Sequence, residues 1–146
     1  MGQSSTGPSG PAAHVVEDTL RVSDLDFQRH MGNTAFTDIL ANARYTFLTE
    51  RVRPVVGFDP IIALARLEVD FKGQVHHPAT LTTETRLDRV GRSSLGLTQR
   101  MLVGTRLVAS SRAVFVLTDR SSGRATPWPE EIRALATASE PEASHP

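Results

Sequence analysis

The residues best suited to chemistry lie in one polar segment, residues 23–33. Two carboxylates, Asp24 and Asp26, precede an imidazole, His30, and the segment runs into a predicted helix. A helix start has backbone N–H groups without acceptors and a partial positive charge, which suit a developing oxyanion. A nearby carboxylate could act as a general base or as a nucleophile toward a carbonyl. Because aspartate is also an ordinary loop residue, the residues alone leave a turn-and-cap role open.

Other reactive residues fit their chemistry less well. His76 and His77 are neighbours that point to opposite sides of an extended chain, so we expect no metal site. A triad could be drawn from Ser23, His30 and Asp38, but the chain has no Gly-x-Ser-x-Gly turn to expose the serine. With 16 Lys+Arg against 16 Asp+Glu and 5% aromatic residues, we expect no binding to nucleic acid.

A long amphipathic helix must position the polar segment. Residues 33–53 carry one apolar stripe at the i, i+3, i+4, i+7 spacing. The stripe consists of Phe36, Ile39, Leu40, Ala43 and Phe47. We expect Asn33 or Thr34 to cap the start of this helix and Pro54 to end it.

Strands are expected on both sides of this helix. One spans residues 14–22, and a meander of four follows over residues 67–72, 80–87, 95–103 and 107–118. The last strand is apolar on both faces, so we expect both faces to be covered. A short helix should open at Pro129. This order predicts an α+β fold in which a mainly antiparallel sheet wraps around the long helix.

The composition fits one soluble domain. We expect it to span residues 14–136 of the 146, between flexible tails at residues 1–13 and 137–146. The chain has no cysteine, no long apolar run and no secretory pattern in its first residues, so we expect a cytoplasmic protein that does not enter a membrane.

The polar segment resembles the signature of hotdog-fold acyl-CoA thioesterases, most closely the 4-hydroxybenzoyl-CoA thioesterase-like group. That signature reads Asp-x-Asp-x-x-Gly-His-x-Asn-Asn-x-x-Tyr, followed by a helix with Glu-x-Ala-Arg. The matching residues here are Asp24, Asp26, His30, Asn33, Ala43 and Arg44, with Phe36 at the position of the tyrosine. Residues 67–72, 89–94 and 127–132 resemble later parts of the family pattern, so the likeness covers nearly the whole expected domain.

The resemblance implies a role for each matching position. Asp26 would be the catalytic carboxylate, and the backbone amide of Asn33 would polarise the thioester oxygen. His30 would position the water or the loop. Phe36, at the helix start, could touch the substrate as well as the core.

The segment at residues 89–94 resembles the family's pantetheine-lining turn. Arg89 and Arg92 would pair with coenzyme A phosphates, and Ser93 and Ser94 would hydrogen-bond the amides of the pantetheine arm. A solvated turn without any binding role is the alternative.

Four positions depart from the family pattern. Arg29 replaces the glycine, Gly32 the first asparagine, Phe36 the tyrosine and Ala41 the helix glutamate. Loss of the glutamate leaves Asp26 as the only good catalytic carboxylate. If Arg29 points inward, it could pair with Asp26 and lower its basicity.

The resemblance implies hydrolysis of an acyl-CoA thioester to free acid and CoA. No separate cofactor is expected, because coenzyme A is part of the substrate. The partners would be an acyl-CoA or acyl-carrier thioester and further copies of the chain, in a homodimer or homotetramer with sites between subunits. The alternatives are a non-catalytic acyl-thioester binding protein and a hotdog dehydratase or hydratase. The acyl chain stays open.

Overall fold

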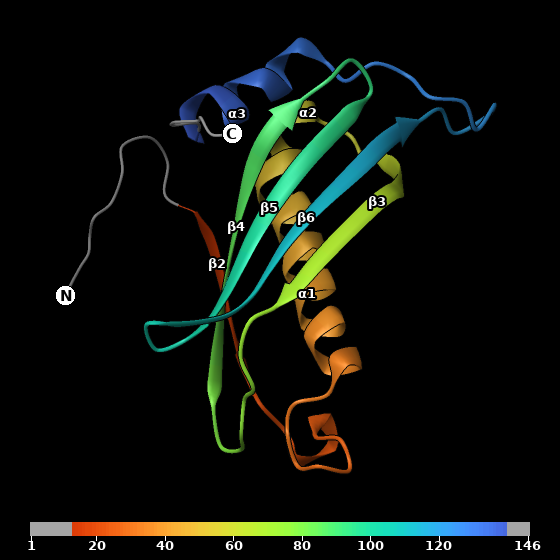
Figure 1. The fold of residues 1–146 in the computed structure, drawn as a ribbon. Helices are drawn as coiled ribbons and strands as arrows, with labels where there is room; N and C mark the ends of the chain where they lie inside the picture. The colour runs from red at the N-terminus through yellow and green to blue at the C-terminus, as the bar shows by residue number, and fades with distance from the viewer. Residues whose placement is uncertain (1–12, 140–146) are drawn as a thin grey trace.

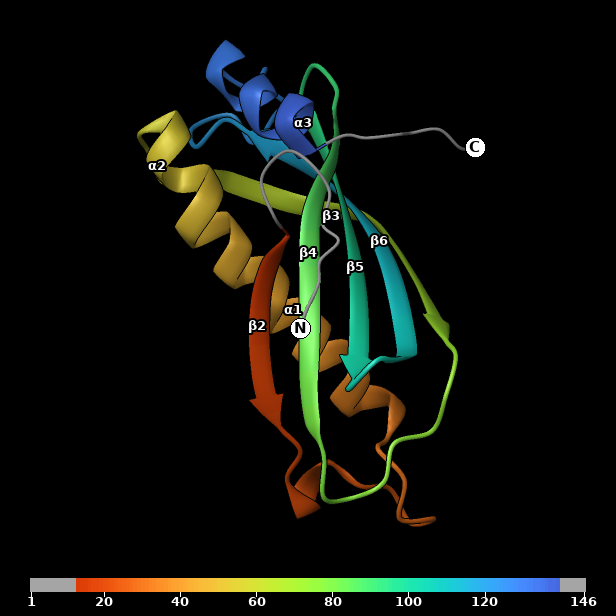
Figure 2. The same cartoon turned by 90° about the vertical axis from the view of Figure 1, so that its left-hand side faces the viewer.

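Five antiparallel strands form a sheet that curves around one long helix (Figures 1 and 2). The computed structural model describes residues 13–139, so most of both expected tails lies outside the described residues. The strands, in the order of the sheet, are β2 (His14–Thr19), β4 (Thr80–Val90), β5 (Ser94–Val103), β6 (Arg106–Thr118) and β3 (Ile61–Phe71). The predicted α+β class is confirmed.

The strand neighbours differ from the expected four-strand meander. β4, β5 and β6 are joined as consecutive neighbours, but β3 pairs with β6 and forms the far edge of the sheet. The connection after Phe71 therefore crosses the end of the sheet before β4 begins at Thr80 (Figure 1). Alternation of apolar residues shows that a strand has two faces, but it does not show which strands pair.

The long helix continues past the predicted stop. α1 (Asn33–Phe47) passes through a π-helical turn (Leu48–Val52) into α2 (Arg53–Val56). The expectation that Pro54 ends the helix is wrong, because the wider π turn before it accommodates a residue that has no N–H to donate. The helix ends instead at Gly57, whose φ of 80° is the left-handed conformation typical of a helix end.

The buried stripe of the helix packs on the inner face of the sheet. Phe36 and Leu40 pack with Met101 and Ala109, and Phe47 packs with residues of β5 and β6. The predicted C-terminal helix follows as a short 3₁₀ turn (Glu130–Ile132) and α3 (Arg133–Ser139), which covers the end of β4. Among the described residues, no helix has the length and apolar composition needed to cross a bilayer.

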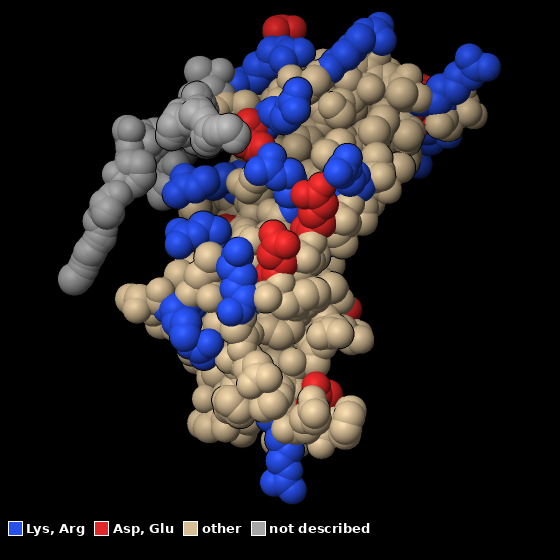
Figure 3. All heavy atoms as spheres, in the orientation of Figure 1, with Lys and Arg blue, Asp and Glu red and all other residues tan. Residues whose placement is uncertain are grey.

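The outer face of the sheet is charged rather than covered. Figure 3 shows acidic and basic side chains mixed over the strands. Ion pairs on the strands join Glu84 to Arg100, Asp88 to Arg112 and Glu68 to Arg66. Within one chain, Arg112 on this face of β6 is exposed and Val114 and Val116 are half-buried, so cover of both faces stays a prediction.

The β3 edge of the sheet is apolar and open. Leu64, Leu67 and Phe71 are 47%, 38% and 49% exposed. Strand β3 has a hydrogen-bonded neighbour on one side only, so its other side presents unpaired backbone groups. An apolar, unpaired edge is a template for another strand.

Candidate active site

The loop before α1 is closed by short backbone links. A 3₁₀ turn (Val22–Asp24) begins it, and the Arg21 amide donates to the Asp24 carboxylate at 2.8 Å. This hydrogen bond, with the adjacent Arg21 guanidinium, holds the pKa of Asp24 below its usual value. The Gly32 amide then donates to the Asp24 carbonyl at 3.0 Å, which returns the loop to the helix start.

Asp26 lies at the centre of this loop and is exposed. Its Oδ1 accepts from the Gln28 amide at 2.9 Å and from the His30 amide at 3.2 Å. Its Oδ2 has no partner among the described residues. One carboxylate oxygen therefore shapes the loop while the other can meet a water or a carbonyl carbon, so the turn-forming and catalytic roles are compatible.

The helix start presents free donors next to this carboxylate. α1 begins at Asn33 with Gly32 as its N-cap, so the expected capping by Asn33 or Thr34 is wrong. The amides of Asn33, Thr34 and Ala35 have no intrahelical acceptor, because they belong to the first turn. No side chain of residues 13–139 forms a capping hydrogen bond to them.

Asp26 and Asn33 line two adjoining clefts. One, of about 380 Å³, lies between the loop and the end of β3. Phe36 and Phe71 form its apolar wall, with their rings edge to face at 5.3 Å. The other, of about 410 Å³, lies on the side of Asp24. The structure thus brings four of the expected residues, Asp26, His30, Asn33 and Phe36, to one cleft.

Three residues of this cleft region were not expected from the sequence. Phe71 and Lys72 line the cleft from the end of β3, and the His76 ring lies edge to face with His30 at 4.7 Å. His76 drew attention only as a possible metal ligand, and the other two only as the end of the strand expected at residues 67–72. Residues 13–139 contain no group of three or more His, Cys, Asp or Glu residues placed to hold a metal ion.

Arg29 occupies a backbone conformation that favours glycine. Its φ is 68°, and it stands where the family pattern has glycine. Its side chain is exposed, and its amide donates to the Asp26 carbonyl at 2.9 Å. Arg29 and Asp26 are therefore joined through the backbone, and the structure gives no ion pair between their side chains.

We expect Arg29→Gly to raise the free energy of unfolding by about 0.5–1 kcal/mol, because it removes the clash of a Cβ in this region. Urea denaturation measures the change. Gln28→Gly is the matched control. Gln28 is not among the residues with a positive φ, so glycine at this position should lower the free energy of unfolding by about 0.5–1 kcal/mol. Equal gains in both variants would contradict the strain argument.

The turn carrying Arg89, Arg92, Ser93 and Ser94 lies at the opposite end of the sheet (Figures 1 and 2). The structure does not bring these residues to Asp26 within one subunit. The turn is firmly held, because the Trp128 amide donates to the Arg92 carbonyl and the Leu117 amide to the Ser93 carbonyl. Ser94 packs so closely on Gly91 that a side chain at residue 91 would collide with its hydroxyl.

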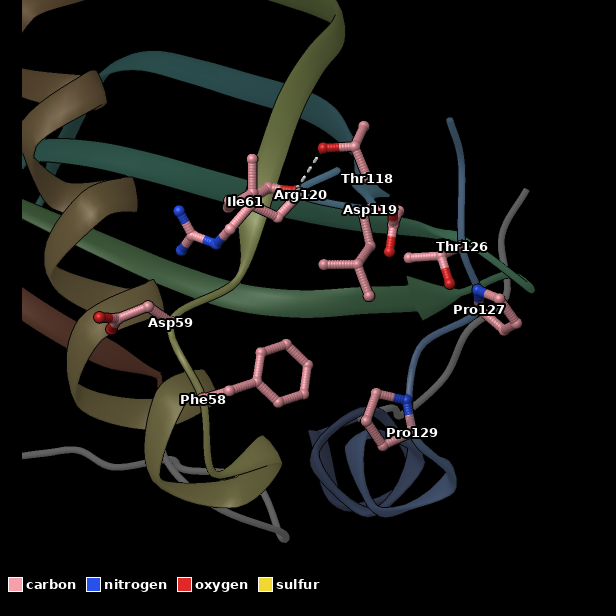
Figure 4. Close-up of a pocket in the computed structure, with 10 residues that line it drawn as sticks. Phe58, Asp59, Ile61, Thr118, Asp119, Arg120, Thr126, Pro127 and Pro129 are labelled. Atoms are coloured by element: carbon pink, nitrogen blue, oxygen red, sulfur yellow. Dashed lines mark hydrogen bonds between the residues drawn. The ribbon is translucent and has the colours of Figure 1, made fainter. Parts of the chain in front are cut away.

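A third cavity, of about 500 Å³, lies at this same end between β3, β6 and residues 126–129. Figure 4 shows Phe58 and Pro129 on facing sides of it. It is remote from Asp26 in the same subunit and holds none of the proposed catalytic groups.

Comparison with known proteins assigns the family. Residues 20–135 match the thioesterase-like superfamily. A predicted thioesterase from Bacillus stearothermophilus is 26% identical, with a TM-score of 0.75 over 87% of this chain and 96% of that one. A thioesterase from Thermus thermophilus, solved with coenzyme A and Zn, is 25% identical, with a TM-score of 0.72 over 88% of this chain and 99% of that one.

A more distant structure shares the fold alone. It is a 1,4-dihydroxy-2-naphthoyl-CoA thioesterase from Synechocystis, 12% identical with a TM-score of 0.71 over 86% of this chain and 96% of that one. A search of curated protein sequences gave no match. The matched family and relatives support thioester hydrolysis as the activity. The chain has the hotdog fold and belongs to the thioesterase-like superfamily.

Proposed function

We propose that this protein hydrolyses acyl-CoA thioesters to a free acid and coenzyme A. One observation carries the proposal: the free Oδ2 of Asp26 and the unpaired amide at Asn33 border the same cleft. A thioester carbonyl between them would have a carboxylate on its carbon side and a hydrogen-bond donor on its oxygen side. The similarity to a thioesterase solved with coenzyme A supports a CoA substrate.

The reaction adds the elements of water across the C–S bond. The Asn33 amide, reinforced by the positive end of α1, stabilises the negative charge that develops on the carbonyl oxygen. Asp26 either takes a proton from the attacking water or attacks the carbonyl carbon and forms an anhydride that water then opens. In both routes the acyl–sulfur bond breaks, the sulfur leaves with a proton as coenzyme A, and the acyl group leaves as the free acid. In the anhydride route, the attack of water also restores the Asp26 carboxylate. His30, held against His76, positions the water.

The proposal includes a dimer formed through β3. Two copies of this strand can pair antiparallel about a twofold axis, which covers Leu64, Leu67 and Phe71 and satisfies the open backbone edge. Antiparallel pairing places opposite ends of the two subunits together. The Arg89–Arg92 turn of one subunit then lies near Asp26 of the other, where it binds the phosphates of coenzyme A.

The same arrangement assigns the remaining roles. Ser93 and Ser94 bind the pantetheine amides, while Phe36 contacts the acyl group from within the cleft. Two dimers could join into a tetramer. As part of the same proposal, the enzyme is cytoplasmic.

Release of free thiol from a panel of short, long and aromatic acyl-CoAs tests the function. We expect turnover of at least one member, which then names the acyl class. The same acyl groups on an acyl carrier protein decide between the two thioester carriers. Binding without turnover across the whole panel would replace the enzyme by a non-catalytic acyl-thioester binding protein, since this chain departs from the family pattern at Arg29, Gly32 and Ala41.

A further inference from the structure

A row of polar side chains crosses the inner face of the sheet beneath the middle of α1. Thr85 of β4, Gln99 of β5 and Ser111 of β6 lie opposite one another in register. They are 0%, 2% and 6% exposed, on a face that is otherwise mostly apolar. Buried polar groups lose their contacts with water, so their placement here needs a reason.

Gln99 joins the helix to the sheet with both ends of its amide. Its Nε2 donates to the Leu40 carbonyl of α1 at 3.0 Å and to the Thr85 hydroxyl at 3.1 Å. Its Oε1 accepts from Nη1 of Arg44, one helical turn after Leu40, at 3.0 Å. One side chain of β5 thus holds two successive turns of the helix.

Arg44 is a poor choice for stability alone. The residue is 5% exposed, and no carboxylate of the described residues forms an ion pair with its guanidinium. Burial lowers the pKa of this guanidinium because it disfavours the charged form. Apolar residues of similar volume often serve a core as well as or better than buried charges do. The charge must therefore provide something other than packing energy.

Hydrogen bonds can fix the position of a helix along a sheet, which apolar contacts alone leave loosely defined. The buried stripe of Phe36, Leu40, Ala43 and Phe47 repeats with each turn, so a slip of one turn, about 5.4 Å, exchanges one apolar residue for another. The bonds from Gln99 fit only when Leu40 and Arg44 lie above it. A buried polar residue fixes register in coiled coils for the same reason.

We propose that Gln99, acting with Arg44, is a positioning residue that sets where α1 begins relative to the sheet. Leu40 lies in the same regular helix as Asn33, so the position of one fixes the position of the other. The cleft has the helix start and Asp26 on one side, and Phe71 and Lys72 at the end of β3 on the other. A displacement of about 1 Å at a reacting group can cost 10²-fold in rate. The effect on rate rests on the proposed thioesterase function.

Two single substitutions and their combination test the inference. Gln99→Met leaves Arg44 without its acceptor, and Arg44→Met leaves Oε1 of Gln99 without its donor, so each should lower Tm. Gln99→Met with Arg44→Met removes both polar groups and should recover Tm. Turnover should not recover with it: we expect kcat at least about 10-fold below the wild type with KM little changed. Turnover that follows Tm back to the wild-type value would overturn the inference.

Thr83→Val is the matched control. Thr83 is a fully buried β4 residue whose hydroxyl has no partner among the described residues, so its loss should leave kcat unchanged and should not lower Tm. The amide ¹H and ¹⁵N shifts of Asn33, Thr34 and Ala35 should move in the double variant and stay in the control. Unmoved shifts in the double variant would overturn the inference. If the wild type hydrolyses no thioester, the proposed function fails, and these shifts still decide the positioning role.

Discussion

Asp26→Asn is expected to lower kcat/KM by about 10²–10⁴-fold without unfolding the loop, the usual range for loss of a catalytic acid or base. The two amides that shape the loop, from Gln28 and His30, both donate to Oδ1. An asparagine keeps an acceptor at that atom and replaces only the free oxygen. The change therefore removes the basic and nucleophilic group while preserving the geometry around it. Thiol release with the best acyl-CoA of the panel measures the effect, and circular dichroism checks the fold.

Glu17→Gln is the control for this experiment. Glu17 is an exposed carboxylate of β2 that lines neither cleft, so it matches the change of charge away from the candidate site. We expect its kcat/KM to stay within about threefold of the wild type, since water and salt screen the charge of an exposed group. Equal activity of Asp26→Asn and the wild type would remove Asp26 from the mechanism.

Leu67→Lys is expected to convert the protein to a monomer and to lower activity by about 10²-fold or more. The residue lies midway along β3, and a charge on an edge strand opposes pairing with a second strand. If each site needs the partner's Arg89–Arg92 turn, separation of the subunits removes part of the substrate-binding surface. Light scattering gives the mass in solution, and thiol release under the same conditions gives the activity.

The opposite edge of the sheet supplies the control. Val15 lies on β2, the other edge strand, and is 53% exposed. Val15→Lys should keep the wild-type mass and activity. A variant of Leu67 that is monomeric and fully active would contradict a site shared between subunits, and loss of the dimer in Val15→Lys alone would move the interface to β2.

Local sequence patterns predicted the helices and strands well, but they predicted the ends of these elements and their positions in the sheet less well. The stripe through Phe36 and Phe47 predicted the helix, because burial of one face follows directly from the period. Pro54 misled, since its effect depends on whether the preceding turn is α or π, and the sequence pattern does not distinguish them. The edge position of β3 could not be predicted either, because partner choice depends on the whole sheet.

The sequence likewise predicted some residues of the candidate site and missed others. Asp26, His30, Asn33 and Phe36 lie within one short segment, so sequence spacing was enough to group them, and the structure places them at one cleft. Phe71, Lys72 and His76 reach the same region from the far edge of the sheet. Their place follows from the crossing of the chain after β3, which no local pattern records. The distance between Asp26 and the Arg89–Ser94 turn also had to await the structure.

The two carboxylate oxygens of Asp26 make different contacts, and this difference affects how the site could change during evolution. An aspartate codon becomes an asparagine codon by one base change. Because both hydrogen bonds that this carboxylate accepts within the loop are to Oδ1, that change would replace the other oxygen, the one proposed to react, and keep the acceptor at Oδ1. Under the proposed mechanism, a lineage could therefore turn a hydrolase into a thioester-binding protein in one step, with the loop before α1 still folded, and could return the same way.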